Sequence, residues 1–177
     1  MPEPEKRHDD IVALVDAAYL LQVNGQPNVT FSIDKQISSV EADVDATMMS
    51  QALTNLLKNA GEAIETRLEK GIEPDLKGRI HVSISMQDEA VHISISDNGM
   101  GLPQDRSRLF EPYVTTRDKG TGLGLPLTKK FVELMGGKFK IESQEGTGTK
   151  ITVTLPQEYE GVGVDEVESP TDEMDAA

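Results

Sequence analysis

The 177-residue chain contains no cysteine and no tryptophan, and only 4% of its residues are aromatic. Without cysteine it forms no disulfide and no thiolate metal site, which fits a reducing compartment such as the cytoplasm. No apolar run approaches the length of a membrane span, and no basic region followed by an apolar core indicates a signal peptide. We therefore expect a cytoplasmic chain that folds as one domain.

Basic residues are missing from one end of the chain. Residues 157–177 contain eight acidic side chains and no Lys or Arg, so the other 156 residues carry −6 of the net charge of −14. This end also has few large apolar groups, and we predict an acidic, disordered tail there. An acidic chain binds nucleic acid poorly, so no nucleic-acid partner is expected.

Helical spacing of apolar residues predicts three helices, over about 11–21, 47–70 and 125–135. Asp9 or Asp10 would cap the first helix, and Asp45 or Thr47 the second. Gly71 would end the second helix. Residues 1–10, with prolines at positions 2 and 4, indicate a linker from a longer protein.

Alternating apolar and polar residues predict strands in "NVTFSIDKQ", "SSVEAD", "RIHVSISMQ", "VHISIS", "KFKIES" and "TKITVTL". Consecutive strands in hairpins favour a mixed, mainly antiparallel sheet with helices on one face, which is an α/β two-layer sandwich of the α+β kind. The stretch 98–121 has no clear period, and a loop of this length in a compact domain is typically functional or disordered.

Two glycine clusters flank that stretch: "DNGMGLP" follows a predicted strand, and "GTGLGLP" opens a predicted helix. Glycines at a helix start let backbone N–H groups converge on an anion. A Walker A loop is excluded because neither Gly-Lys-Ser nor Gly-Lys-Thr occurs. A Rossmann fingerprint is disfavoured because "EPYVTTRDK", which precedes the second cluster, does not have the pattern of a strand.

The ordered combination of motifs resembles the catalytic and ATP-binding domain of sensor histidine kinases, within the gyrase, Hsp90, histidine kinase and MutL superfamily. "QALTNLLKNAGEAIE" is similar to the N box, "DNGMGLP" to the first glycine box, "LFEPYVTT" to the F box and "GTGLGLPLTKK" to the second glycine box. The wording is most similar to nitrogen-regulation, NtrY-like sensor kinases. The resemblance implies a Bergerat-type ATP-binding fold over residues 11–156, with an ATP lid over about 98–121.

The resemblance implies that Asn59 binds Mg²⁺ and that Asn55, one turn earlier, lines the same pocket. One amide oxygen suffices because magnesium keeps several waters and takes phosphate oxygens as further ligands. Plain solvation is the alternative for an exposed helical Asn. Glu62 stands where many family members carry a phosphate-binding Lys, so phosphate neutralisation would depend more on Arg117 and on magnesium.

The resemblance also implies that Asp97 accepts a hydrogen bond from the adenine amino group. Guanine has an acceptor at that position, so Asp97 would select ATP over GTP. Gly99 and Gly101 would let the chain pass close to the base, next to Leu102, and Thr149 would hold the base through water. The alternative for Asp-Asn-Gly is ordinary turn chemistry.

Inside the predicted lid, Phe110 would be the anchor, or a core residue, and Arg117 would reach the terminal phosphate unless it is a solvated charge. The phosphates would lie against the start of the last helix. The cluster implied to hold them there comprises Gly120, Thr121, Gly122, Leu123 and Gly124.

The resemblance implies phosphoryl transfer rather than hydrolysis. ATP-hydrolysing relatives carry a Glu as general base four residues before the magnesium Asn, where this chain has Asn55, and an amide is a poor base. The expected reaction is attack of a histidine nitrogen on the γ-phosphorus, with Asn59 and Arg117 as catalytic residues.

None of the three histidines, His8, His81 and His92, lies in a phosphoacceptor pattern, and all three are expected to be solvated surface residues. The resemblance implies that the acceptor lies on a separate helical dimerisation domain, N-terminal to this one. The other implied partners are ATP or ADP and a response regulator, and this chain would be a monomeric part of a homodimer in the bacterial inner membrane. The alternatives are a nucleotide-responsive binding module without transfer activity and an ATPase clamp.

Overall fold

The computed structural model describes residues 3–103 and 124–157. The elements follow in chain order: β1 (Arg7–Asp10), α1 (Ile11–Gly25), β2 (Val29–Lys35), β3 (Glu41–Val44), α2 (Ala46–Glu69), β4 (Gly78–Gln87), β5 (Ala90–Asp97), α3 (Gly124–Leu134), β6 (Lys138–Gln144) and β7 (Gly148–Pro156). Every predicted helix and strand is present. Apart from Gln157, the predicted tail lies outside the described residues.

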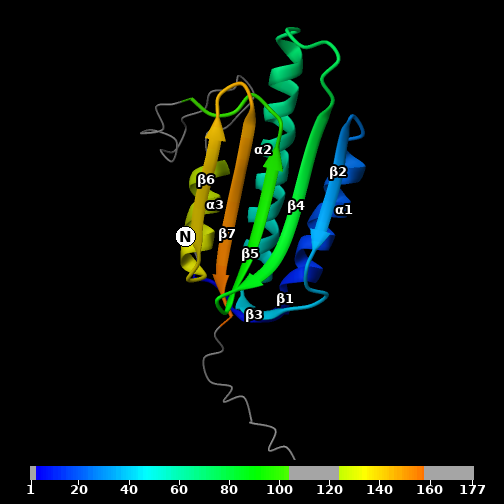
Figure 1. Ribbon diagram of the computed structural model, residues 1–177. Coiled ribbons are helices and arrows are strands. Elements are labelled where there is room, and N and C mark those ends of the chain that lie inside the picture. The colour runs from blue at the N-terminus through cyan, green and yellow to red at the C-terminus, as the bar shows by residue number, and fades with distance from the viewer. Residues whose placement is uncertain (1–2, 104–123, 158–177) are drawn as a thin grey trace, which may run out of the picture.

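The main sheet has two faces of different character. Within the described residues it contains five strands in the order β2-β4-β5-β7-β6, with β2 and β4 parallel and the other neighbours antiparallel. All three helices cover one face, and the other face is open (Figure 1). The predicted two-layer α/β sandwich with a mixed, mainly antiparallel sheet is therefore confirmed.

Helix α2 is the central helix of the covering layer. Its N-cap is Asp45, whose carboxylate accepts a hydrogen bond of 3.1 Å from Met48 N. Its apolar face is buried against the sheet, and Leu53 is only 1% exposed. Truncation of such a leucine to alanine costs about 2–5 kcal/mol of stability. The chain leaves the helix at Gly71 with φ +66°, a backbone conformation that favours glycine.

The hairpin of β4 and β5 brings the first glycine cluster to one end of the sheet. Asp88 and Glu89 have φ of 51° and 60° and connect the paired residues Gln87 and Ala90, so the turn has two residues with left-handed backbones. The last residue of β5 is Asp97. In Figure 1 this end of β5 lies beside the turn between β6 and β7, at the end of the molecule away from β1 and β3.

The prediction of a linker over residues 1–10 is wrong for residues 7–10. They form β1, which pairs antiparallel with β3 in a separate two-stranded sheet, and the backbone N–H of Glu5 donates to the Asp45 carboxylate at 2.8 Å. The segment "RHDD" has no apolar alternation, and the pairing brings His8 opposite Asp43, with Nε2 3.1 Å from Oδ1. No helix in the described part of the chain is long and apolar enough to cross a membrane.

Candidate functional site

The inward face of the main sheet changes from apolar to polar at one end. Asp97, Thr149 and Ser143 lie side by side on β5, β7 and β6, because Asp97 pairs with Thr149 and Thr149 pairs with Ser143. The next inward row is wholly apolar and consists of Val82, Ile95, Ile151 and Ile141. The polar row therefore marks the boundary between the core and a site.

A small cavity of about 30 Å³ adjoins this polar row. Asn59 from α2, Asp97 and Thr149 from the sheet, and Gly101 and Leu102 from the following loop all line it, so five of the predicted site residues converge there. This volume is room for one or two waters, which is less than a purine ring needs. Entry of a base therefore requires partly exposed side chains in the wall, such as Leu102, to move aside.

The carboxylate of Asp97 has a defined orientation. One oxygen, Oδ1, accepts a hydrogen bond of 2.8 Å from Gly99 N, and the residue is half-buried where it lines the cavity. An ionised carboxylate accepts hydrogen bonds and cannot donate them. At this position the site therefore favours a ligand that presents an N–H or O–H group.

The first two glycines after β5 are required by contacts with the protein itself. A Cβ atom at Gly99 would lie 2.6 Å from the backbone of Ala63 in α2. Gly101 has φ +73°, and a Cβ there would collide with the carbonyl oxygen of Gln144. Glycine is therefore needed at both positions to fit this loop between α2 and the β6–β7 turn.

Asn59 lies beside the start of α3. A Cβ built at Gly124, the first residue of α3, would be 3.4 Å from Asn59 Nδ2 and 3.6 Å from Oδ1. The N–H groups at a helix start favour an anion, and an amide oxygen is a suitable magnesium ligand. The described residues contain no cluster of three His, Cys, Asp or Glu side chains for a metal.

Several predicted site residues are not brought to this cavity. Asn55 is half-buried on α2 but does not line the cavity, and Glu62 lines a different hollow. Six predicted residues lie outside the described residues: Phe110, Arg117, Gly120, Thr121, Gly122 and Leu123.

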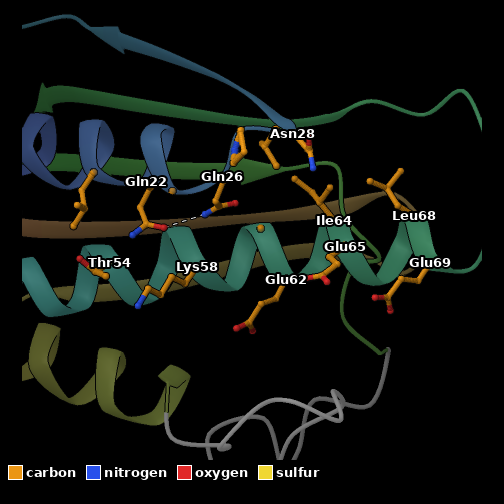
Figure 2. A pocket seen from close by; sticks show the side chains of 15 residues that line it. Gln22, Gln26, Asn28, Thr54, Lys58, Glu62, Ile64, Glu65, Leu68 and Glu69 are labelled. Atoms are coloured by element: carbon orange, nitrogen blue, oxygen red, sulfur yellow. Dashed lines mark hydrogen bonds between the residues drawn. The ribbon is translucent and has the colours of Figure 1, made fainter.

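A second hollow between α1 and α2 is much larger, at about 970 Å³ (Figure 2). Gln22 and Gln26 line it, and Gln26 Nε2 donates to Gln22 Oε1 at 3.0 Å and to the Leu57 carbonyl at 3.2 Å. Volume alone favours this hollow as a ligand site. The small cavity differs from this hollow in its chemistry, because an oriented carboxylate, Asp97, lines it and the start of α3 lies beside its Asn59.

Two side chains that sequence reasoning missed hold the walls of the cavity. Ser143 Oγ accepts from Leu102 N at 2.8 Å, donates to Gly148 O at 3.0 Å and lies 2.8 Å from Thr149 Oγ1. Arg67 on α2 donates to backbone carbonyls on two neighbouring segments. A signal for Ser143 exists in the sequence, because it is polar at an inward position after the apolar Phe139 and Ile141.

None of the histidines lines the cavity. His8 is exposed and lies 3.1 Å from an oxygen of Asp43, and His81 is exposed with Nδ1 2.6 Å from the Ser32 hydroxyl. His92 is half-buried, with Nδ1 3.2 Å from the Thr154 hydroxyl, so it is less solvated than expected.

Comparison with known proteins identifies similar chains. Residues 44–159 match the family described as histidine kinase-, DNA gyrase B-, and HSP90-like ATPase. The nitrogen regulation protein NtrY of Azorhizobium caulinodans is 44% identical over 163 residues, which are 89% of this chain and 20% of NtrY. Sporulation kinase B of Bacillus subtilis is 32% identical over 157 residues, 86% of this chain and 34% of that protein. The chain thus spans about a fifth to a third of these relatives.

Solved structures agree with the fold. The catalytic domain of histidine kinase ThkA superposes with a TM-score of 0.71 at 26% identity, over 86% of this chain and 96% of that chain. The mycobacterial sensor histidine kinase MprB has the same fold, with a TM-score of 0.71 at 22% identity over 85% of this chain and 97% of that chain.

Proposed function

Because this chain belongs to the family of histidine kinase-, DNA gyrase B- and HSP90-like ATPases, we propose that it binds Mg-ATP in the small cavity and presents the γ-phosphoryl group to a histidine of another domain. The observation that carries the proposal is the position of Asp97 and Thr149 at the polar end of the sheet, opposite Asn59 and Gly124. This arrangement separates an end suited to a base from an end suited to phosphates.

At the base end, the Asp97 carboxylate accepts the hydrogen bond of the adenine amino group. Its orientation is set in advance by the bond from Gly99 N, so little ordering is needed when the base binds. Thr149, whose hydroxyl is within 2.8 Å of Ser143 Oγ, contributes a second polar group beside it. An oxygen substituent in place of the amino group would face the Asp97 carboxylate, which only accepts hydrogen bonds when ionised, and would bind less well.

At the phosphate end, Asn59 and the start of α3 hold the triphosphate, with Gly120, Thr121, Gly122 and Leu123 before α3 and Arg117 as further ligands. Bound magnesium supplies charge neutralisation at the phosphate oxygens. The side chain of Asn59 offers it one amide oxygen, and Gly124 leaves room beside that amide.

The chemistry we propose is in-line transfer to a histidine nitrogen. A nucleophilic water would need a general base near the γ-phosphate, and Asn55, which stands at the corresponding place, is an amide outside the cavity. The acceptor histidine would lie on a helical domain of the same protein, whose phosphate then passes to a response regulator.

The similarity to NtrY supports a role in nitrogen regulation, with this chain as the cytoplasmic part of a homodimeric sensor of the inner membrane. A nucleotide-responsive module without transfer activity would share the binding site. The kinase and the module differ in whether the bound nucleotide transfers its phosphoryl group, so a binding measurement alone does not distinguish them.

The test has two stages. Calorimetry with a non-hydrolysable ATP analogue, with and without Mg²⁺, should show binding that magnesium strengthens and that the corresponding GTP analogue does not match. The chain is then joined to the helical domain of its parent protein and incubated with labelled ATP. Phosphohistidine on that domain supports the proposal, nucleotide binding without phosphohistidine favours the module, and no binding at millimolar nucleotide refutes both.

A further inference from the structure

Arg67 connects three parts of the molecule near the cavity. Its Nη1 donates to the carbonyls of Asn98 and Gly99, at 2.9 and 3.3 Å, and to that of Thr147 at 3.0 Å. Its Nη2 forms a bidentate contact with Glu73, at 2.9 and 3.0 Å to the two carboxylate oxygens. The Arg67 side chain is only 16% exposed.

The carbonyls that Arg67 binds belong to the two segments that carry the base end of the site. Asn98 and Gly99 directly follow Asp97, and Thr147 lies two residues before Thr149 in the β6–β7 turn. Charge-assisted hydrogen bonds from one rigid guanidinium therefore hold both segments against α2.

Two backbone hydrogen bonds near Arg67 depend on the same arrangement of α2 and the loops. Met100 N donates to the Ala63 carbonyl at 3.0 Å, and Gly146 N donates to the Met100 carbonyl at 2.6 Å. The first bond joins the loop after β5 to α2, and the second joins the β6–β7 turn to that loop. Together they connect the same three parts as Arg67. If the guanidinium is removed, two partly buried carbonyls and the exposed carbonyl of Thr147 lose this donor, and the loop after β5 is held less firmly against α2.

We propose that Arg67, oriented by Glu73, is a positioning residue that determines purine selectivity by holding the loop after β5 in place, so that Gly99 N keeps the Asp97 carboxylate in its orientation. The proposal rests on the binding of ATP in the cavity, as proposed above. Arg67 does not line that cavity and acts only through the two backbone segments. Its loss should affect the base end of the site and leave the phosphate end, at Asn59, unchanged.

The test compares Arg67→Met and Arg67→Lys with the unchanged chain. Lysine keeps the charge but lacks the planar fork that binds Glu73 and the carbonyls together. The matched control is Arg79→Met, which removes the same charge from an exposed arginine near the same loop. Glu73→Gln is a milder variant that keeps the guanidinium in case Arg67→Met does not fold. Affinities for ATP and for inosine triphosphate, which differ at the 6-position of the base, are measured with and without Mg²⁺.

We expect the preference for ATP over inosine triphosphate to fall by about tenfold in Arg67→Met, the change typical for loss of a hydrogen-bonded charged group. Arg67→Lys should restore it only in part, Glu73→Gln should lower it less, and Arg79→Met should leave it unchanged. The factor by which Mg²⁺ strengthens binding should stay the same in all variants. Amide hydrogen exchange of Met100 and Gly146, measured without nucleotide, should become faster in Arg67→Met.

The outcomes distinguish this proposal from the proposed function. If the unchanged chain binds both nucleotides and Arg67→Met lowers only the melting temperature, with unaltered selectivity and exchange, Arg67 is a structural brace and the proposal is overturned. If the unchanged chain binds neither nucleotide, the proposed function fails. In that case amide hydrogen exchange still tests whether Arg67 orders the loops. Unaltered exchange at Met100 and Gly146 in Arg67→Met overturns that role, and faster exchange supports it.

Discussion

Asp97→Asn is the substitution that most directly tests the assignment of the base site. Asparagine has the same shape, and its carbonyl oxygen can keep the hydrogen bond from Gly99 N, which is 2.8 Å long in the structure. The amide nitrogen then faces the cavity and replaces an acceptor with a donor. Two donors, this nitrogen and the adenine amino group, would meet where a charge-assisted hydrogen bond existed.

The expected loss follows from the strength of that bond. A hydrogen bond to a charged group contributes about 1.5–3 kcal/mol, which corresponds to roughly 10- to 150-fold weaker binding of an ATP analogue. Inosine triphosphate, which carries an acceptor oxygen at the 6-position, should bind to Asp97→Asn as well as or better than to the unchanged chain. The preference between the two bases would therefore narrow or reverse.

Isothermal titration calorimetry with both nucleotides measures this change directly. Asp75→Asn is the matched control, because it removes the same charge from an exposed aspartate in the loop after α2. Thermal unfolding of each variant shows that the fold is intact. If Asp97→Asn binds the ATP analogue within about threefold of the unchanged chain, and inosine triphosphate does not gain, Asp97 does not contact the base.

Three further substitutions probe the cap, the glycine loop and the metal end. The hydrogen bond from Met48 N holds the pKa of Asp45 below its ordinary value, so Asp45→Ala should cost about 1 kcal/mol at neutral pH. That cost is present above the unfolded-state pKa and should vanish as the pH falls through the lower folded-state pKa, as urea unfolding at several pH values would show. Gly99→Ala should destabilise by about 1–3 kcal/mol, because its Cβ would lie 2.6 Å from the α2 backbone; an unchanged urea midpoint would contradict this contact. Asn59→Ala should abolish most of the gain in ATP affinity from Mg²⁺, whereas Asn55→Ala should retain it. Nucleotide titration at varied Mg²⁺ measures this gain, and its loss in Asn55→Ala but not in Asn59→Ala would contradict the assignment.

Most of the fold is predictable because its elements have strong local signals. The apolar positions of α2 repeat at helical spacing between a cap at Asp45 and a stop at Gly71, and both boundaries agree with the structure to within one residue. The pairing of β1 with β3 is not predictable, since "RHDD" shows no alternation. Its contact with Val44 depends on a segment more than thirty residues away.

The site is less predictable from the sequence than the fold is. The motifs point to Asn59, Asp97 and Thr149 only through a family resemblance, because spacing alone does not show that positions 38 and 52 residues apart line one cavity. Arg67 has no sequence signal at all, since its acceptors are backbone carbonyls. Their positions follow from the packing of loops 31 and 80 residues along the chain.

The polar row formed by Asp97, Thr149 and Ser143 continues the same strands that carry the apolar core, so binding and folding use one set of hydrogen-bonded strands. A ligand held there, as we propose for ATP, binds only the folded chain and acts as a folding ligand. At a free concentration about 100 times Kd it adds about 2.7 kcal/mol to stability. The folded lifetime of the protein, and with it its resistance to proteolysis, would then follow the nucleotide concentration of the cell.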